Sequence, residues 1–497
     1  MSSNTRFGTP TGAWIAERLW DQNAEAEFSS WIEQLGSERA KGTFRKLADG
    51  IASRQANRLY TDEDRSFRVF ADCADVPVVL RAYFAYKTRR PFQFVSRTSG
   101  SRYTAGNKPT AYKDFRDYGD LKSMLKAIST AVHSGFYRTA PEVEDTDTYP
   151  IDVTPRSIRP GVLFYDPNGH VLLVYKVEPN GLVRLMDGHP DNSLTHTIFG
   201  EKFARGGSKQ GGGFRAWRPY RASGSTTTFE FVRQKNKALP EFSAAAQYQR
   251  SYTVGDHTVG YHDWVRSRLS GQGSRVKPVE EFGEMLSALC TDIQDRVEAV
   301  NSAVGAGIHC QAHPGSLPTN IYGSEGEWET WSTPSRDARL KASFHGLHEF
   351  VKETVTARRN GDSRIDFDGD ARALAAAYLD AWNRQATEFR VTYKASNGVE
   401  RSLDLNEVLR RLFALSFDPY HSIELRWGVT PPGEGRPAHP EYAASADTAD
   451  KVAWYWKEQR LRNAIERLYG QPTPLDSGPS EAPDVDVPAL MRSLAQV

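Results

Sequence analysis

The sequence predicts an α+β protein: N-terminal helices, then an antiparallel sheet, then a mostly helical C-terminal region. Two changes of pattern along the chain lead to this prediction. Up to about Pro150 the apolar residues recur mainly at helical spacing, whereas short apolar segments separated by turn residues follow it. From about residue 229 the helical spacing returns. Hydrophobic residues make up 39% of the 497 residues and charged residues 25%, a composition typical of globular domains.

The first predicted part is an N-terminal helical segment over residues 1–55. Two groups of residues near helical spacing define it: Trp14, Ile15, Leu19 and Trp20, and then Phe28, Trp31, Ile32 and Leu35. Further along, the apolar spacing predicts a helix that begins after Cys73 and ends before Pro91. A strand over 92–96 and a helix over about 112–135 are expected next.

The second part, residues 56–222, is predicted to combine these helices with an antiparallel sheet. Turn residues at 166–169 and 179–181 are typical of hairpins and separate the apolar segments. The predicted strands are Ile151–Val153, Val162–Tyr165, His170–Val177, Leu182–Asp187 and Gly213–Tyr220. The run from Val171 to Tyr175 is apolar throughout, as in a buried strand.

A Ser/Thr/Gly-rich stretch over 221–228 is the predicted domain boundary. A mostly helical domain is expected over 229–470, with helices at about 278–304, 335–358, 370–388, 403–415 and 450–469. The last part, 471–497, is rich in proline and acidic residues and is expected to be a flexible tail.

Charge and composition exclude several classes of function. The 63 basic and 62 acidic side chains give a net charge of +1, so no overall field recruits nucleic acid. No stretch approaches the ~18 consecutive apolar residues of a membrane span. The N-terminus lacks the apolar segment of a signal peptide, which leaves a cytoplasmic protein or a processed periplasmic or secreted one. The oligomeric state is not predicted.

No cofactor or metal is expected. The chain has three cysteines, too few for a disulfide framework. Residues 309–313 have ligand-like His and Cys spacing without a fourth ligand, and the acidic run 366–370 lacks the closing glutamate of a calcium loop.

Cys73 and His170 are the candidate nucleophile and base. Cys73 precedes the predicted helix, where free N–H groups and the helix dipole favour a thiolate. Asp72 or Asp75 is expected to cap that helix, although a carboxylate close to the sulfur raises the pKa of the thiol. His170 begins a buried strand, so its ring is held rigidly and can face a helix packed on the sheet.

A catalytic imidazole also needs an acceptor on its second nitrogen. The hairpin that turns at 179–181 returns residues 187–189 to the neighbourhood of His170. Asp187 is the first candidate for this orienting role and His189 the second.

Short motifs around these residues resemble the NlpC/P60 cysteine peptidases of the papain-like superfold. They are the Asp72–Asp75 segment, the Pro-Gly turn of 159–164 and Gly169-His170-Val171. Each motif is short, and the region of resemblance covers about a third of the chain. The bacterial transglutaminase-like group, with Cys, His and Asp in the same order, is equally similar. The resemblance implies acyl-enzyme chemistry on an amide bond, with cell-wall stem peptides as substrate in NlpC/P60. It also makes Tyr60 the candidate for an oxyanion-binding tyrosine.

The chain departs from the NlpC/P60 pattern in two respects. The interval between Cys73 and His170 is longer than usual, and Ala74-Asp75 stand where that family has Gly or Ser-Gly. The expected function is therefore a thiol peptidase or amidase acting through Cys73 and His170 on a peptide or peptidoglycan-like substrate. Two alternatives stay open: a non-catalytic papain-like scaffold or binding protein, and a transglutaminase-like acyl transferase.

Overall fold

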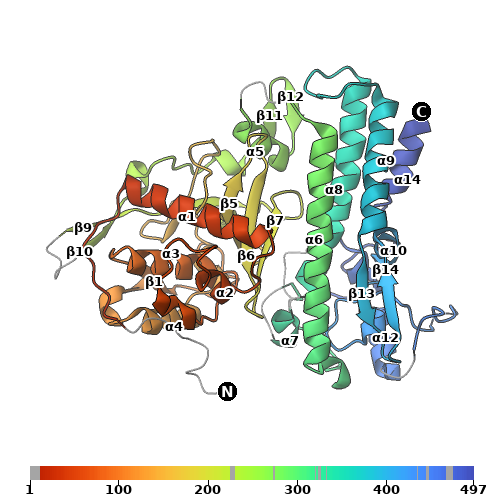
Figure 1. Cartoon of the computed structure of the whole chain (residues 1–497), viewed down its shortest axis with the longest axis horizontal. Helices are drawn as coiled ribbons and strands as arrows, with labels where there is room; N and C mark the ends of the chain where they lie inside the picture. Colours follow the sequence, from red (N-terminus) through yellow and green to blue (C-terminus); the bar gives the residue numbers. More distant parts are fainter. Residues whose placement is uncertain are drawn as a thin grey trace. The chain divides into compact units, whose positions relative to one another are not determined.

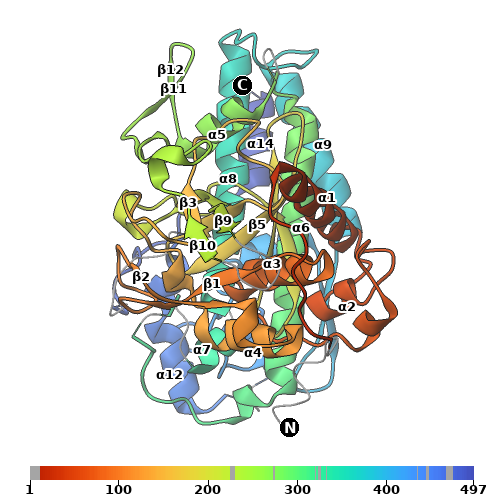
Figure 2. The same ribbon diagram turned by 90° about the vertical axis from the view of Figure 1, so that its left-hand side faces the viewer.

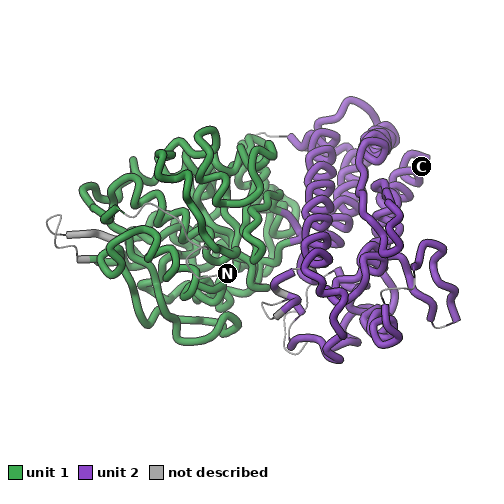
Figure 3. Tube along the Cα trace, turned by 60° about the horizontal axis from the view of Figure 1, so that its bottom comes forward, with its two compact units in different colours: residues 1–199, 203–272 green, residues 200–202, 273–497 purple. Residues whose placement is uncertain are grey.

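The protein consists of two compact units with mixed α and β structure. The computed structural model describes residues 12–496 except 224–229, 272–274, 320, 323–325, 332, 434, 444–446 and 466–473. Unit 1 contains residues 1–199 and 203–272, and unit 2 contains residues 200–202 and 273–497 (Figure 3). Among the described helices, none is long and apolar enough to cross a membrane.

Unit 1 is built around a six-stranded antiparallel sheet. The strands are β3 (Thr148–Pro150), β4 (Leu163–Asp166), β5 (His170–Val177), β6 (Val183–Gly188), β7 (Leu194–Ile198) and β8 (Gly213–Trp217). They lie in the order β3-β8-β4-β5-β6-β7, so β5, which begins with His170, is an inner strand (Figure 1). Three two-stranded ribbons are separate from it: β1 (Gln93–Thr98) with β2 (Pro109–Asp114), β9 (Tyr220–Ser223) with β10 (Glu230–Arg233), and β11 (Tyr252–Val254) with β12 (His257–Val259).

Side chains cap the N-termini of some of the helices of unit 1. The helices of this unit are α1 (Gln22–Ala40), α2 (Leu47–Ile51), α3 (Asp75–Lys87), α4 (Leu121–Ala131) and α5 (Tyr261–Leu269). The Asp21 carboxylate accepts the Ala24 N–H at the start of α1, and Asp120 accepts the Ser123 N–H at the start of α4. The ribbon of β1 and β2 lies beside α4 (Figure 2).

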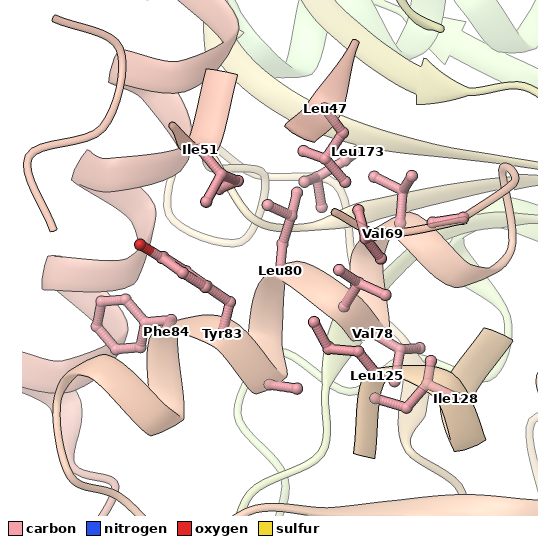
Figure 4. Packing of buried hydrophobic residues seen from close by; sticks show 14 of the residues in the cluster. Leu47, Ile51, Val69, Val78, Leu80, Tyr83, Phe84, Leu125, Ile128 and Leu173 are labelled. Carbon is pink, nitrogen blue, oxygen red and sulfur yellow. The ribbon is translucent and has the colours of Figure 1, made fainter. Parts of the chain in front are cut away.

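Both faces of the sheet are buried, in two different cores. Along β5, Val171, Leu173 and Tyr175 join the core formed with α1, α3 and α4, whereas Leu172 and Val174 join a second core. Figure 4 shows the first core, where Leu80 of α3 lies close to Leu173. The period of two along a strand therefore places alternate residues in different cores.

The second core explains why the predicted domain boundary is wrong. It is completed by residues beyond 230, including Leu239, Tyr252, Tyr261 and Trp264. Gln247 also reaches into the sheet region, where its amide donates to the Ile151 and Phe214 carbonyls. The division between the units accordingly lies after Gln272, later than the predicted boundary at 221–228, of which 224–228 lie outside the described residues.

Residues 13–21 are not helical, in contrast to the prediction for the N-terminal segment. The Trp14 N–H donates to the Gly119 carbonyl and the Glu17 N–H to the Arg89 carbonyl, which extends the chain along neighbouring segments. Trp14 and Ala16 are buried while Ile15 is 52% exposed, a period of two rather than of a helix. The predicted helix over 112–135 is also shorter, because β2 occupies 109–114 and α4 begins at Leu121.

Unit 2 is mostly helical, as predicted. Its helices are α6 (Pro278–Gly305), α7 (Gly326–Thr330), α8 (Thr333–Arg359), α9 (Ala371–Glu388), α10 (Leu405–Arg411), α11 (Ile423–Arg426), α12 (Ala449–Lys457), α13 (Gln459–Asn463) and α14 (Val487–Gln496). One ribbon, β13 (Val391–Lys394) with β14 (Glu400–Leu403), was not anticipated.

The prediction of a flexible tail over 471–497 is wrong for its last part. Residues 471–473 and 497 lie outside the described residues, but α14 packs against α8 and α9. Val485, Val487 and Met491 are buried in the core of unit 2. The apolar residues of this segment therefore contribute to the fold, although proline and acidic residues precede them.

Candidate functional site

Cys73 lies in the turn that leads into α3. The Asp72 carboxylate accepts the N–H groups of Ala74 and Asp75, at 2.9 and 3.3 Å, and so acts as the capping side chain. The helix begins at Asp75 even though Pro77 follows, because a proline in the first turn loses no intrahelical hydrogen bond. The cysteine is therefore held directly before the N-terminus of the helix.

His170 and Asp187 form a hydrogen-bonded pair on adjacent strands. His170 Nε2 lies 2.5 Å from Asp187 Oδ2, which joins the start of β5 to the end of β6. Cys73 Sγ lies 3.7 Å from the carbonyl oxygen of Gly169, the residue before His170. Asp187 thus contacts the Nε2 side of the imidazole ring.

His189, the second candidate orienter, contacts Asp187. His189 Nε2 is 3.2 Å from Asp187 Oδ2 and 2.9 Å from Thr195 Oγ1. The Thr195 hydroxyl donates to Asp187 Oδ1 at 2.6 Å. The structure therefore brings together Cys73, His170, Asp187 and His189, with Asp187 at the centre of the polar cluster.

Close backbone contacts hold the cysteine turn against the strands that carry His170 and Asp187. A Cβ atom on Gly188 would lie 2.5 Å from Val76 Cγ2 and 3.0 Å from the Asp72 carbonyl oxygen, so a glycine is needed for β6 to lie against the cysteine turn. The Tyr137 hydroxyl donates to the Ala74 carbonyl at 2.8 Å. The next residue, Arg138, donates to the Pro167 carbonyl in the turn before His170.

The electrostatics favour a neutral thiol and an ionised Asp187. Burial raises the pKa of the Cys73 thiol well above its ordinary value, and the nearby Asp72 raises it further. Burial also favours the neutral form of Asp187, but the charges of His189 and His170 outweigh it and hold the pKa of this carboxyl well below its usual range. The resting site is therefore not a preformed thiolate.

Cys73 and His170 are more accessible than Asp187 and His189. Cys73 is half-buried, and 12% of the His170 side chain is exposed. Asp187 and His189 are buried.

Tyr60 is placed in a separate polar group on the surface. Arg65 Nε donates to the Tyr60 hydroxyl at 3.1 Å, and the Arg54 guanidinium lies 4.8 Å from the ring centroid. The Tyr60 hydroxyl also lies 3.5 Å from Asp62 Oδ1. These are its hydrogen-bond and ring partners among the described residues, so its role in binding an oxyanion stays a prediction.

Thr195, Tyr137 and Arg138 are the site residues that the sequence analysis did not identify. Thr195 belongs to β7, a strand without a strong apolar alternation. Tyr137 and Arg138 follow a short 3₁₀ turn, Ser134–Phe136, and reach the site only through tertiary contacts. A polar threonine facing Asp187 across paired strands is the one feature that a strand register would have revealed, since Asp187 pairs directly with Thr195.

Unit 2 contains a buried group with metal-ligand residue types: His313, Asp418 and Glu458, whose ligand atoms lie within 4.8 Å of one another. His313 Nδ1 accepts the Gly315 N–H at 3.0 Å, so the neutral ring carries its proton on Nε2 and donates it to Asp418 at 2.9 Å. A metal ligand nitrogen must be unprotonated, and the Arg462 guanidinium lies only 3.9 Å from Glu458. The group thus favours hydrogen bonding over a cation.

The comparisons with known proteins gave no match: no family model, no curated protein and no solved structure was found to be similar.

Proposed function

We propose that unit 1 is a thiol hydrolase of the papain-like type that cleaves an amide bond through an acyl-enzyme on Cys73. The observation that carries this proposal is the hydrogen bond between His170 Nε2 and Asp187 Oδ2, beside a cysteine at the start of a helix. Nucleophile, base and orienting acceptor are the three parts that such chemistry requires.

The proposed reaction begins with general-base catalysis. Because the thiol is neutral at rest, His170 Nδ1 takes the Cys73 proton as the sulfur attacks the amide carbonyl carbon. The ionised Asp187 stabilises the imidazolium that results. His170 then gives this proton to the leaving amine, and a water molecule hydrolyses the thioester in a second, analogous step.

The carbonyl oxygen of the substrate needs a hydrogen-bond donor as it becomes negative. Asp72 already accepts the N–H groups of Ala74 and Asp75. The Cys73 N–H has no hydrogen-bond partner among the described residues, so it is the donor that we assign to the oxyanion. Tyr60 is retained as a second candidate because of the NlpC/P60 resemblance alone.

The substrate class rests on that resemblance and not on a feature of the site. Peptides with the stem-peptide chemistry of bacterial cell walls are the first class to test, and generic peptide amides are the second. Transfer of the acyl group to an amine instead of water, as in the transglutaminase-like group, would use the same residues.

Turnover of both substrate classes by the purified protein tests the proposal. Wild type is expected to release a new amine, Cys73→Ala to be inactive, and His170→Ala to be nearly so. Cys310→Ser is the matched control, because this thiol is exposed and lies in unit 2. Full activity of Cys73→Ala would refute the mechanism.

A non-catalytic scaffold is the second candidate, and one observation favours it. Burial and the neighbouring Asp72 both disfavour the thiolate of Cys73, whereas cysteine peptidases need that thiolate to be accessible. If wild type binds stem peptides or peptide amides without cleaving them, and Cys73→Ala binds them equally well, the site acts as a binding surface.

A further inference from the structure

Unit 1 has an open pocket that is separate from the cysteine site. Its volume is about 1290 Å³, and Trp217 at the end of β8 belongs to its lining. Trp217 pairs with Thr148, whereas Gly213 at the other end of β8 pairs with Tyr165, next to the turn that precedes His170. The pocket therefore lies toward the end of the sheet opposite His170.

The pocket lining includes an ion pair packed on aromatic rings. Arg81 of α3 is buried and forms two hydrogen bonds to the Glu25 carboxylate. Its guanidinium also lies 3.8 Å from the Trp20 ring centroid and 5.4 Å from that of Trp217. This ion pair is satisfied within the protein, so it offers shape and an aromatic surface rather than charge to a ligand.

The lining of the pocket includes both acidic and basic side chains. A flank of α1 contributes small and polar side chains and Glu33. Arg156, Arg159 and Lys237 come from other segments of unit 1. Arg156 is 3.4 Å from a carboxylate oxygen of Glu241. Within the described part of the chain, neither Arg159 nor Lys237 has a hydrogen-bond or ion-pair partner for its side-chain cation.

We propose that this pocket binds a small amphiphilic anion, a carboxylate or phosphate carried on an apolar body. Arg159 and Lys237 supply the two unpaired cations for the anionic group. The remaining lining supplies apolar surface, to which Leu19, Pro160, Leu239 and Pro240 contribute. Leu19 is 51% exposed, so apolar area is available that a ligand would bury.

The charged side chains that lack a partner favour an anionic ligand over a cationic one. Asp21 caps α1, Glu25 is held by Arg81 and Glu241 lies beside Arg156, so three of the acidic lining residues are already engaged. Glu33 is the one acidic lining residue with no ion pair among the described residues. Two unpaired cations thus outnumber the single unpaired carboxylate in the lining.

Calorimetric titration with octyl phosphate, kept below its aggregation concentration, tests the proposal on the full chain. Octanol serves as the uncharged analogue and inorganic phosphate as the charge without the apolar body. Octyl phosphate is expected to bind about tenfold or more tightly than either, because it alone uses both the cations and the apolar surface.

Variants locate the binding site. The double variant Arg159→Gln, Lys237→Gln removes both charges but keeps much of the apolar part of each side chain. It should lower the affinity for octyl phosphate about tenfold. Glu33→Gln, which removes the unpaired carboxylate of the lining, is the matched control and should leave binding unchanged or tighter. Circular dichroism checks that each variant is folded. Equal affinity for octanol and octyl phosphate, or an unaffected double variant, would overturn the proposal.

A membrane surface would present similar chemistry and is the competing source of the anion. Vesicles of phosphatidylglycerol are therefore included as a separate arm. Binding to these vesicles without binding to octyl phosphate would overturn the assignment to a small ligand. The readouts do not involve Cys73, so they are independent of amide hydrolysis.

Discussion

At the residue scale, the structure separates the roles of Asp187 and His189. Asp187 Oδ2 is 2.5 Å from His170 Nε2, whereas the two histidine rings are 5.8 Å apart between centroids. His189 instead contacts Thr195 and Asp187, and through Asp187 it is linked to His170. The carboxylate orients the imidazole directly, and His189 helps to keep that carboxylate in place and ionised.

Two isosteric changes should therefore have unequal effects on amide hydrolysis. Asp187→Asn should lower kcat/KM by roughly 10²-fold or more, because the amide can donate to the ring and stabilise the wrong tautomer. His189→Gln should cost about tenfold or less, since an amide can still bond to Thr195. Steady-state kinetics on the same substrate measures both, and a larger loss for His189→Gln would reverse the assignment.

The sequence could point to Cys73, His170 and Asp187 because each has a local signal. A cysteine stands before a helix pattern, a histidine begins an apolar strand, and an aspartate lies on the returning strand of its hairpin. Thr195 and Tyr137 have no such signal, because their contacts depend on strand register and on tertiary packing. Local patterns thus indicate candidate reacting groups better than the residues that surround them.

At the element scale, α14 shows how a short apolar segment contributes to a fold. Met491 belongs to α14, which packs on α8 and α9, and its side chain is fully buried in the core of unit 2. Met491→Ala should lower the free energy of unfolding by about 2–4 kcal/mol, through lost burial and the cavity left behind. Ser493→Ala, at an exposed position of the same helix, is the control and should have little effect.

Chemical denaturation of the full chain measures this difference. If Met491→Ala unfolds at the same denaturant concentration as wild type, α14 is not part of the cooperative core. Deletion of residues 485–497 should lower the free energy of unfolding at least as much, because Val485 and Val487 are removed as well.

The elements that sequence patterns missed are those whose geometry is set by a neighbour. Residues 13–21 have apolar spacing that fits either a helix or an extended chain. Their N–H groups donate to the carbonyls of Gly119 and Arg89, which favours the extended chain. β13 and β14 are only four residues each, too short for a reliable alternation. Long helices such as α6, α8 and α9 were predicted nearly to their ends, since many turns repeat the same signal.

At the scale of the whole molecule, residues 230–272 are required to complete unit 1. They cover the second face of the sheet, on which Leu172 and Val174 are buried. The uninterrupted apolar run of β5 already implied two covered faces, although it did not indicate which segment covers the second. A fragment that ends at Gln272 should therefore fold, and one that ends at Ser223 should expose apolar surface.

Expression of both fragments tests this expectation. Cooperative thermal unfolding followed by circular dichroism is expected for the longer fragment only, and the shorter one should bind an apolar dye such as anilinonaphthalene sulfonate. Equal cooperativity of the two fragments would restore the boundary near residue 223.

The stability of unit 2 should depend on the proton of Glu458. Both carboxyl oxygens of this residue are buried and lack a hydrogen-bond partner, and Asp418, His313, Arg462 and Tyr455 are the titratable groups around it. Burial raises the pKa of Glu458 well above its ordinary value, and the Asp418 carboxylate raises it further. The raised pKa therefore favours the neutral, protonated form of Glu458.

The sign of the pH effect follows from this raised pKa. In the unfolded chain a glutamate has a pKa of about 4.3, so the folded state holds the proton more tightly. The stability linked to that proton is complete below the unfolded-state value and is lost as pH rises toward the folded-state pKa, at about 1.4 kcal/mol per pH unit. Glu458→Gln replaces the neutral acid with a neutral amide and should remove this loss.

The unfolding midpoint of unit 2, measured from pH 5 to pH 8 for wild type and variant, tests the assignment. The unfolding midpoint of Glu458→Gln should rise steadily relative to that of wild type as pH rises. The midpoint of the exposed control Glu400→Gln should equal that of wild type at every pH. A constant offset across the pH range would mean that Glu458 is already ionised in the folded chain. A rise in the wild-type midpoint on addition of Zn²⁺, absent from the variant, would instead assign His313, Asp418 and Glu458 to a bound cation, against the hydrogen-bonding pattern of His313.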